Sequence, residues 1–164
     1  MSDVMRLLFG TIKLNHKLMK TLFIVPSAIF TDTANNPVSR LMQTTHTIDS
    51  INATCPGSDI VILETGNSLI PEWATAHFPE NVDLINWQGA DWVRKINTDA
   101  KNISASLDES NKDNIFRGYI KSATEIETIL RFLELRDLSK YDIIFKLSGR
   151  YALNRYFNIN NFIG

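Results

Sequence analysis

The sequence predicts a three-layer α/β/α domain built on a mostly parallel sheet. Short apolar runs typical of buried strands recur along the chain, at 21–26, 59–64 and 141–147. Segments whose apolar residues have helical spacing lie between them, the longest at 116–136. Strands that alternate with helices are typical of right-handed βαβ crossovers, and these crossovers generate parallel sheets.

The first βα unit lies near the start of the domain. The run TLFIVP at 21–26 is partly β-branched and ends in proline, as a buried strand does. Helical spacing over 38–55 follows, with Pro37 suited to the first turn and Pro56-Gly57 to the end of the helix.

The second unit and a third strand complete the first half of the chain. DIVILE at 59–64 predicts a strand buried on both faces, followed by a turn and a short helix at 71–76. VDLINW at 82–87 is shorter and less apolar, so we expect this third strand toward an edge of the sheet.

The second half predicts two helices and a last strand. A helix is expected over 90–103, and the polar stretch 104–114 predicts a loop. A Ser122/Thr124 start signal and regular apolar spacing predict the longest helix within 116–136. YDIIFKL at 141–147 then predicts another core strand.

Length and charge indicate one domain and no nucleic-acid partner. The 164 residues carry 44% apolar and 21% charged side chains and a formal net charge of -1. Such a chain has no long-range field to gather nucleic acid. We expect a domain over 20–164 and an N-terminal extension over 1–19, whose amphipathic pattern favours packing on the body or on a second subunit.

Cysteine usage and hydropathy favour a cytoplasmic protein. The lone Cys55 excludes an internal disulfide, which is typical of a reducing compartment. The sequence has no apolar run long enough to predict a membrane span, and its start lacks the pattern of a signal peptide.

The strongest candidate site follows the last strand. In open parallel sheets, ligands bind beyond the carboxyl ends of the strands. There the sequence reads Lys146-Leu147-Ser148-Gly149-Arg150, which combines small residues with two cations suited to a diphosphate. The alternative is structural: Arg150 pairs with a nearby carboxylate, and Gly149 only turns the chain.

Two other strand ends supply candidates. Arg40, at the start of the first helix, could contact an anion or a base, or could lie exposed without a role. Glu64 ends a buried strand and suits catalysis or ribose binding, but carboxylates in this position also anchor loops. The three tryptophans, Trp73, Trp87 and Trp92, are expected in the core or in subunit contacts.

The sequence lacks the motifs of several common kinds of functional site. His16, His46 and His77 show no spacing typical of metal ligands. The sequence also lacks the glycine-rich motifs of dinucleotide oxidoreductases and P-loop NTPases, and the nucleophile elbow of α/β-hydrolases.

Three stretches carry a resemblance to a known family. RLMQTTHTIDSINATCPGSDIVILETG, RGYIKSATEIETILRFLEL and YDIIFKLSGRYALN resemble, in pattern and order, small glycosyltransferase-like proteins of viral and marine microbial sequences. These are distantly similar to the WavE type of lipopolysaccharide synthesis. The resemblance covers residues 20 to 158 and implies a GT-A fold that binds a nucleotide-diphosphate sugar.

The resemblance implies roles for particular residues. The loop after the first strand, with Ser27 to Asp32, and Arg40 would lie near the nucleotide. Lys146, Ser148 and Arg150 would lie near the diphosphate. Where GT-A enzymes usually carry DxD and bind Mn²⁺ or Mg²⁺, this chain has Ser148-Gly149-Arg150, so either cations replace the metal or no sugar is transferred.

The resemblance also implies further acceptor-binding and catalytic-base residues after the last strand, whereas the sequence ends at Gly164. A natural short form, a truncated reading frame, and half of a site completed by a homo-oligomer are the alternatives. The expected function is transfer of sugar from a nucleotide-sugar to an unknown acceptor. The rival hypotheses are a nucleotide or nucleotide-sugar binding module without turnover, and an interaction protein that has lost the site.

Overall fold

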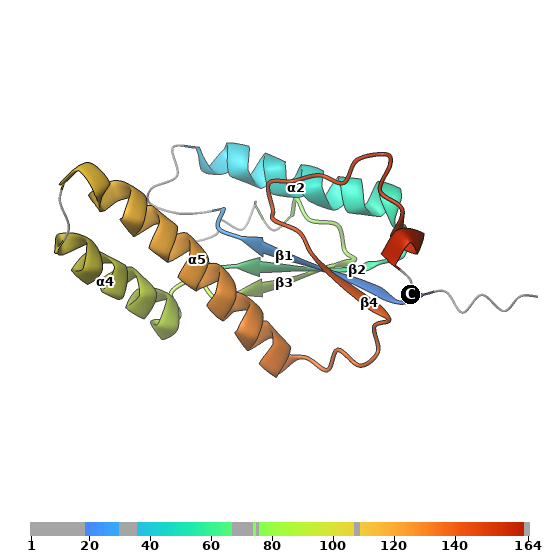
Figure 1. Cartoon of the computed structure of the whole chain (residues 1–164). Helices are drawn as coiled ribbons and strands as arrows, with labels where there is room; N and C mark the ends of the chain where they lie inside the picture. Colours follow the sequence, from blue (N-terminus) through green and yellow to red (C-terminus); the bar gives the residue numbers. More distant parts are fainter. Residues whose placement is uncertain (1–18, 30–35, 67–73, 75, 107–108, 163–164) are drawn as a thin grey trace, which may run out of the picture.

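The computed structural model describes residues 19–29, 36–66, 74, 76–106 and 109–162. Within these ranges the chain forms a four-stranded sheet in the order β3-β2-β1-β4, and every strand pairs parallel to its neighbour. Helices cover both faces of this sheet (Figure 1). The predicted α/β class with a parallel sheet is confirmed.

The strands follow the apolar runs closely. They are β1 (Thr21–Ser27), β2 (Asp59–Glu64), β3 (Val82–Asn86) and β4 (Ile143–Lys146). β1 extends one residue past Pro26, because Ser27 still pairs with Glu64 in the parallel register. β3 lies at one edge of the sheet, as its lower hydrophobicity predicted.

β4 differs from the expected core strand. It forms the other edge of the sheet and is four residues long, with alternate residues half-buried and exposed. It begins two residues later than expected because Tyr141 donates its N–H to Leu138 O in a turn, at 3.0 Å. The N–H groups of Asp142 and Ile143 then both point to Lys20 O at the start of β1.

The helices are α2 (Pro37–Thr54), α4 (Asp91–Ala105) and α5 (Glu109–Leu135), and a short 3-10 helix, η1, spans Ile159–Phe162. Asn36 caps α2 through its side chain, which accepts the N–H of Ser39 at 2.9 Å, and Pro37 occupies the first turn as expected. The predicted loop over 104–114 is wrong, because α4 extends to Ala105 and α5 begins at Glu109. The predicted helix at 71–76 lies mostly outside the described residues.

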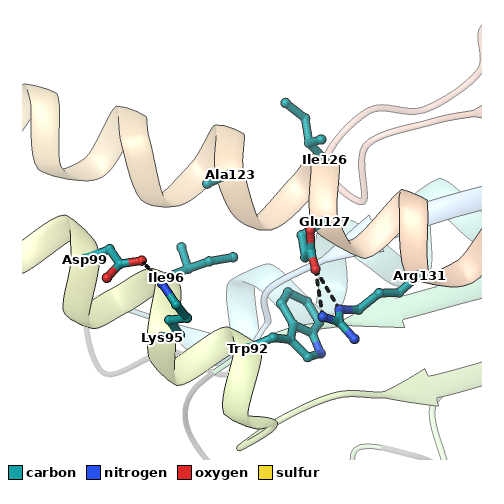
Figure 2. A pocket seen from close by; sticks show the side chains of 8 residues that line it. All are labelled: Trp92, Lys95, Ile96, Asp99, Ala123, Ile126, Glu127 and Arg131. Atoms are coloured by element: carbon teal, nitrogen blue, oxygen red, sulfur yellow. Dashed lines mark hydrogen bonds and ion pairs between the residues drawn. The ribbon is translucent and has the colours of Figure 1, made fainter.

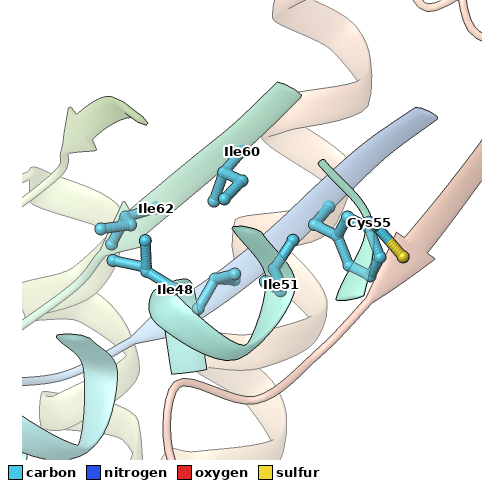
Figure 3. Close-up of a cluster of buried hydrophobic side chains, with 7 residues drawn as sticks. Ile48, Ile51, Cys55, Ile60 and Ile62 are labelled. Carbon is cyan, nitrogen blue, oxygen red and sulfur yellow. The ribbon is translucent and has the colours of Figure 1, made fainter. Parts of the chain in front are cut away.

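One face of the sheet packs against α2. Alternate residues of β1 and β2 point to this face and meet a row of apolar residues from the helix (Figure 3). This cluster consists of Phe23, Val25, Ile48, Ile51, Cys55, Ile60 and Ile62. The same face continues to β4, where Phe145 stacks on Phe23 with ring centroids 5.1 Å apart.

The segment after β4 returns across the α2 side of the sheet (Figure 1). Its Phe157 packs edge-on against Phe145, and Leu153 N–H donates to Ser50 Oγ of α2 at 2.9 Å. β4 is therefore covered on the α2 side by the end of the chain.

The opposite face packs against α5, with α4 beside it. Leu22 and Ile24 of β1, with Val61 and Leu63 of β2, enclose Phe132 of α5. Alternating residues of each strand thus serve different layers, which produces the predicted three-layer arrangement. None of the described helices is long and apolar enough to cross a membrane.

A hydrogen bond joins Tyr141, just before β4, to Asp59 at the start of β2. Its contribution to stability can be tested by changing the pH. Tyr141 Oη donates to Asp59 Oδ2 at 2.7 Å. Burial, followed by this bond to Asp59, raises the pKa of Tyr141 from 10.0 to about 12. The folded chain therefore holds the phenolic proton more tightly than the unfolded chain does, so this contribution is complete below pH 10 and is lost as the pH rises towards 12.

We expect the urea midpoint of the wild type to fall more steeply than that of Tyr141→Phe between about pH 9 and pH 12. Phenylalanine preserves the ring but cannot titrate, so the difference between the two profiles isolates this hydroxyl. Parallel profiles would contradict the assignment.

Candidate functional site

The order of the strands creates a switch point between β1 and β4. From β1 the chain moves through α2 to β2 and on to β3, and then returns to the other side of β1 to form β4. In open parallel sheets, ligands bind beyond the carboxyl ends of the strands at such a reversal. We call the carboxyl ends of β1 and β4, with residues 27–29 and 147–150, the switch-point edge.

The structure brings three of the expected segments together near this edge. Ser27 ends β1 with its side chain almost fully buried, and its carbonyl accepts the N–H of Thr65 at 3.0 Å. Gly149 N–H donates to Pro26 O at 3.3 Å. The loops after β1, β2 and β4 are therefore tied to one another by backbone hydrogen bonds.

Gly149 is needed for close packing rather than for a left-handed backbone. It is buried, and only Gly57 and Gly89 have positive φ among the described glycines. A Cβ at Gly149 would lie 3.1 Å from Thr44 Oγ1 and 3.5 Å from Pro26 O. This position therefore accepts a side chain only if Thr44 Oγ1 moves by a few tenths of an ångström, whereas the contact with Pro26 O would be an ordinary one.

Thr44 fixes the loop from the α2 side. Its Oγ1 donates to Gly149 O at 3.1 Å in a buried environment. Thr44 was not among the site residues predicted from the sequence. Its position three residues after Leu41 does place it on the buried face of the predicted helix. A hydroxyl among the apolar residues of the buried helical face was the signal that could have identified it, although Thr47 shares this signal.

Arg150 is exposed next to this fixed loop. In the described part of the chain, no carboxylate forms an ion pair with it. Ser148 is half-buried, and its carbonyl accepts the N–H of Tyr151 at 3.0 Å. A planar guanidinium on a constrained loop can donate two parallel hydrogen bonds to a phosphate.

Lys146 does not join Arg150 in the described arrangement. Its ammonium forms an ion pair with Glu125 of α5, on the other side of the sheet from Thr44. Alternation along β4 explains this, because Phe145 points toward the α2 cluster and Lys146 therefore points to the α5 side. No pattern in the sequence identified Glu125 as the partner of Lys146.

Glu64 is completely buried and serves as a loop anchor. Its two carboxylate oxygens accept the N–H of Ile29 at 3.0 and 3.1 Å, and Oε1 also accepts the N–H of Gly66 at 2.8 Å. These donors belong to the loops after β1 and β2. The structure thus favours the anchoring role over the catalytic or ribose-binding role that was the alternative.

Arg40 also stabilises the loop after β1. Its Nη1 donates to Ala28 O at 2.6 Å from the first turn of α2. Nearby, Ile29 packs with Leu41 and Ala74 in a small apolar cluster. Asp32, the remaining candidate near the nucleotide, lies outside the described residues, as do Trp73 and His16.

The remaining tryptophans are half-buried, and Trp87 packs against the apolar cluster on the α5 face of the sheet. Trp87 and Trp92 contact each other edge-on, with centroids 5.8 Å apart, and Arg131 lies over the Trp92 ring. Trp92 and Arg131 belong to α4 and α5, whereas Trp87 follows β3 and donates its N–H to Glu64 O. A groove of about 400 Å³ lies between these two helices, with Trp92, Ile96 and Ala123 in its walls (Figure 2).

A second hollow, of about 310 Å³, lies between α5 and β4 and includes Lys146 and Glu125. Within the described ranges, no group of three or more His, Cys, Asp or Glu side chains could hold a metal ion. No protein-family model, curated protein or solved structure matches this chain.

The anchoring role of Glu64 predicts a stability effect. Glu64→Gln keeps the shape of the side chain but replaces one acceptor oxygen with a donor that faces the N–H of Ile29. Leaving a buried group unsatisfied costs about 1–3 kcal/mol, so we expect the free energy of unfolding in urea to fall by about that amount.

Glu80→Gln is the matched control, because Glu80 is exposed. It should change the free energy of unfolding by less than about 0.5 kcal/mol. Equal effects of the two substitutions would show that the hydrogen bonds of Glu64 contribute no more than a surface charge does.

Proposed function

We propose that the chain is a glycosyltransferase-like protein that binds a nucleotide-diphosphate sugar at the switch-point edge and transfers the sugar to an acceptor. The observation that carries the proposal is the exposed Arg150, next to the constrained Gly149 at the reversal of strand order. This combination supplies a cation on a fixed backbone at the edge where α/β sheets bind ligands. A GT-A-like relationship is part of the same proposal.

The chemistry of sugar transfer gives Arg150 a role. As the bond from the anomeric carbon to the phosphate oxygen breaks, negative charge grows on the departing diphosphate and positive charge on the sugar. A guanidinium that contacts the diphosphate stabilises this separation electrostatically. Lys146 could add to this only by leaving Glu125, so Arg150 is the principal candidate.

The nucleotide half of the ligand would contact the loop after β1. Ser27 and Arg40 bound the described part of this loop, and the bond from Arg40 to Ala28 O holds its backbone against α2. We propose that these two residues limit the space for the base and the ribose. A divalent cation, Mn²⁺ or Mg²⁺, could also bind the diphosphate, so the experiment includes a divalent cation as a variable.

A binding module without turnover is the second candidate. Glu64, the strand-end carboxylate that could have acted in catalysis, accepts the backbone N–H groups of Ile29 and Gly66 and is completely buried. A base in this state cannot reach an acceptor hydroxyl. An interaction protein that binds no nucleotide is the third candidate. The cytoplasmic location of the protein stays a prediction.

A thermal-shift screen tests the proposal. UDP-, GDP-, CMP- and dTDP-sugars are added with and without Mn²⁺. A ligand at about 100 times its dissociation constant stabilises the folded chain by about 2.7 kcal/mol, which corresponds to a rise in Tm of about 5–10 °C. We expect such a rise for at least one nucleotide-sugar and its loss in Arg150→Ala.

Arg155→Ala is the matched control. Arg155 is also exposed but is directed to the neighbouring Tyr156, so its removal should leave the ligand-dependent rise unchanged. Release of nucleoside diphosphate in the presence of the stabilising ligand would support transfer or hydrolysis, whereas a rise in Tm without release supports the binding module. If no nucleotide-sugar raises the Tm, both nucleotide proposals fail.

A further inference from the structure

Helix α5 carries a row of five apolar side chains and one serine on one side, and all of them except the half-buried Ile129 are exposed. Residues at alternating spacings of four and three share one side of the helix, as in a heptad repeat. We call this row the α5 stripe, and it consists of Ile115, Tyr119, Ser122, Ile126, Ile129 and Leu133. Ile126, near its centre, leaves 61% of its surface exposed, and Leu130 beside it leaves 50%.

The contacts of α5 within the fold use other sides of the helix. Phe132 and Thr128 are buried, Phe132 against β1 and β2. Glu127 and Arg131 face α4, where Arg131 lies over Trp92, and Ile126 lies at the border of the groove between the two helices, where it is largely exposed (Figure 2). The α5 stripe is thus a third side, which these described contacts with the sheet and with α4 leave uncovered.

The α5 stripe continues onto the edge of the sheet. The hollow between α5 and β4 is bordered by Ser122, Ile126 and Ile129 on one side and by Lys146 on the other. Ile144, two residues before Lys146 and on the same face of β4, is also exposed. Among the described residues, the segment after β4 packs on the α2 side of the strand, and the α5 side contacts Glu125 through Lys146.

We propose that the α5 stripe packs antiparallel against the α5 stripe of a second copy of this chain. A long row with heptad spacing fits a helix rather than a small ligand, because knobs of a second helix insert along its whole length. A symmetric pair also requires that the row be complementary to itself.

The antiparallel arrangement satisfies this requirement. With the two-fold axis midway between Ser122 and Ile126, every large apolar residue of the stripe meets a partner of suitable size. Ile115 meets Leu133 of the second copy, and Tyr119 meets Ile129. The small Ser122 meets Ile126, the most exposed residue of the stripe, which avoids overpacking at the centre.

The size of the surface predicts how tight the pair is. Positions 115 and 133 are 18 residues apart, a rise of about 27 Å along the helix. A helix face of that length and about 10 Å width supplies only part of the ~800 Å² per partner of a standard interface. We therefore expect a dimer that dissociates on dilution rather than a permanent one.

Sedimentation velocity of the full chain over about 1–100 µM tests the pairing, since this range brackets a micromolar dissociation constant. We expect the wild type to shift from monomer to dimer and Ile126→Glu to raise the dissociation constant at least ~10-fold, because a carboxylate at the centre of the contact is desolvated without a partner. Circular dichroism should show that the exposed substitution leaves the fold unchanged.

Met42→Glu is the control, because Met42 is 67% exposed on α2, on the other side of the sheet. It should dimerise like the wild type. A wild type that stays monomeric over this range, or equal effects of the two substitutions, would overturn the proposal. Failure of nucleotide binding at the switch-point edge would not affect it.

Cysteine cross-linking tests the direction of the helices. A mixture of Ile115→Cys and Leu133→Cys chains should form a disulfide-linked dimer, because the antiparallel register brings these positions within the Cα separation of a disulfide. Ile115→Cys alone should not, because its two copies would lie at opposite ends of the contact. Cys55, the lone native cysteine, is buried. Cross-linking of Ile115→Cys alone would overturn the antiparallel arrangement.

Discussion

The position of β1 at the centre of the sheet is the constraint on which the other elements depend. β1 pairs with β2 along one edge and with β4 along the other, and its alternate side chains enter two separate cores. A strand in that position must be apolar on both faces, which explains why its sequence shows no alternation. Because α2 and α5 pack on opposite faces of the same strand, a disruption of β1 would disturb all three layers.

Glu64 extends this central constraint to the loops. A buried carboxylate is costly unless each oxygen is hydrogen-bonded, and here backbone N–H groups of the loops after β1 and β2 supply the bonds. Thr44 performs the corresponding task for the loop after β4. Three loops at one edge of the sheet are therefore held by buried polar side chains, and Arg150 stands beside them as an exposed cation. A fixed loop loses less entropy when it binds a ligand.

The sequence predicted the strands well because each is a short apolar run between clear turn signals; β2 matches its expected range of 59–64. It failed over 104–114, where polar composition suggested a loop although much of that stretch continues the amphipathic helices. The prediction that β4 is a core strand was also wrong. β4 lies at an edge of the sheet, and its Phe145 packs against the α2 cluster. For the site, sequence order could place Glu64 and Arg150 at strand ends. It could not reveal that Glu64 faces inward or that Lys146 pairs with Glu125, because both depend on which face of the sheet a residue joins.

The short pairing of β4 has a consequence for motion. β4 is held by four residue pairs with β1 alone, whereas β1 and β2 share six and are buried on both faces. Amide protons of β4 should therefore exchange with solvent through local opening at lower free energy than those of β1. The loop that carries Arg150 follows the more weakly held strand, while Ser27 and Glu64 belong to the firmly held pair. The fixed position of the Arg150 loop therefore depends on the hydrogen bonds of Gly149 to Thr44 and Pro26 rather than on the pairing of β4.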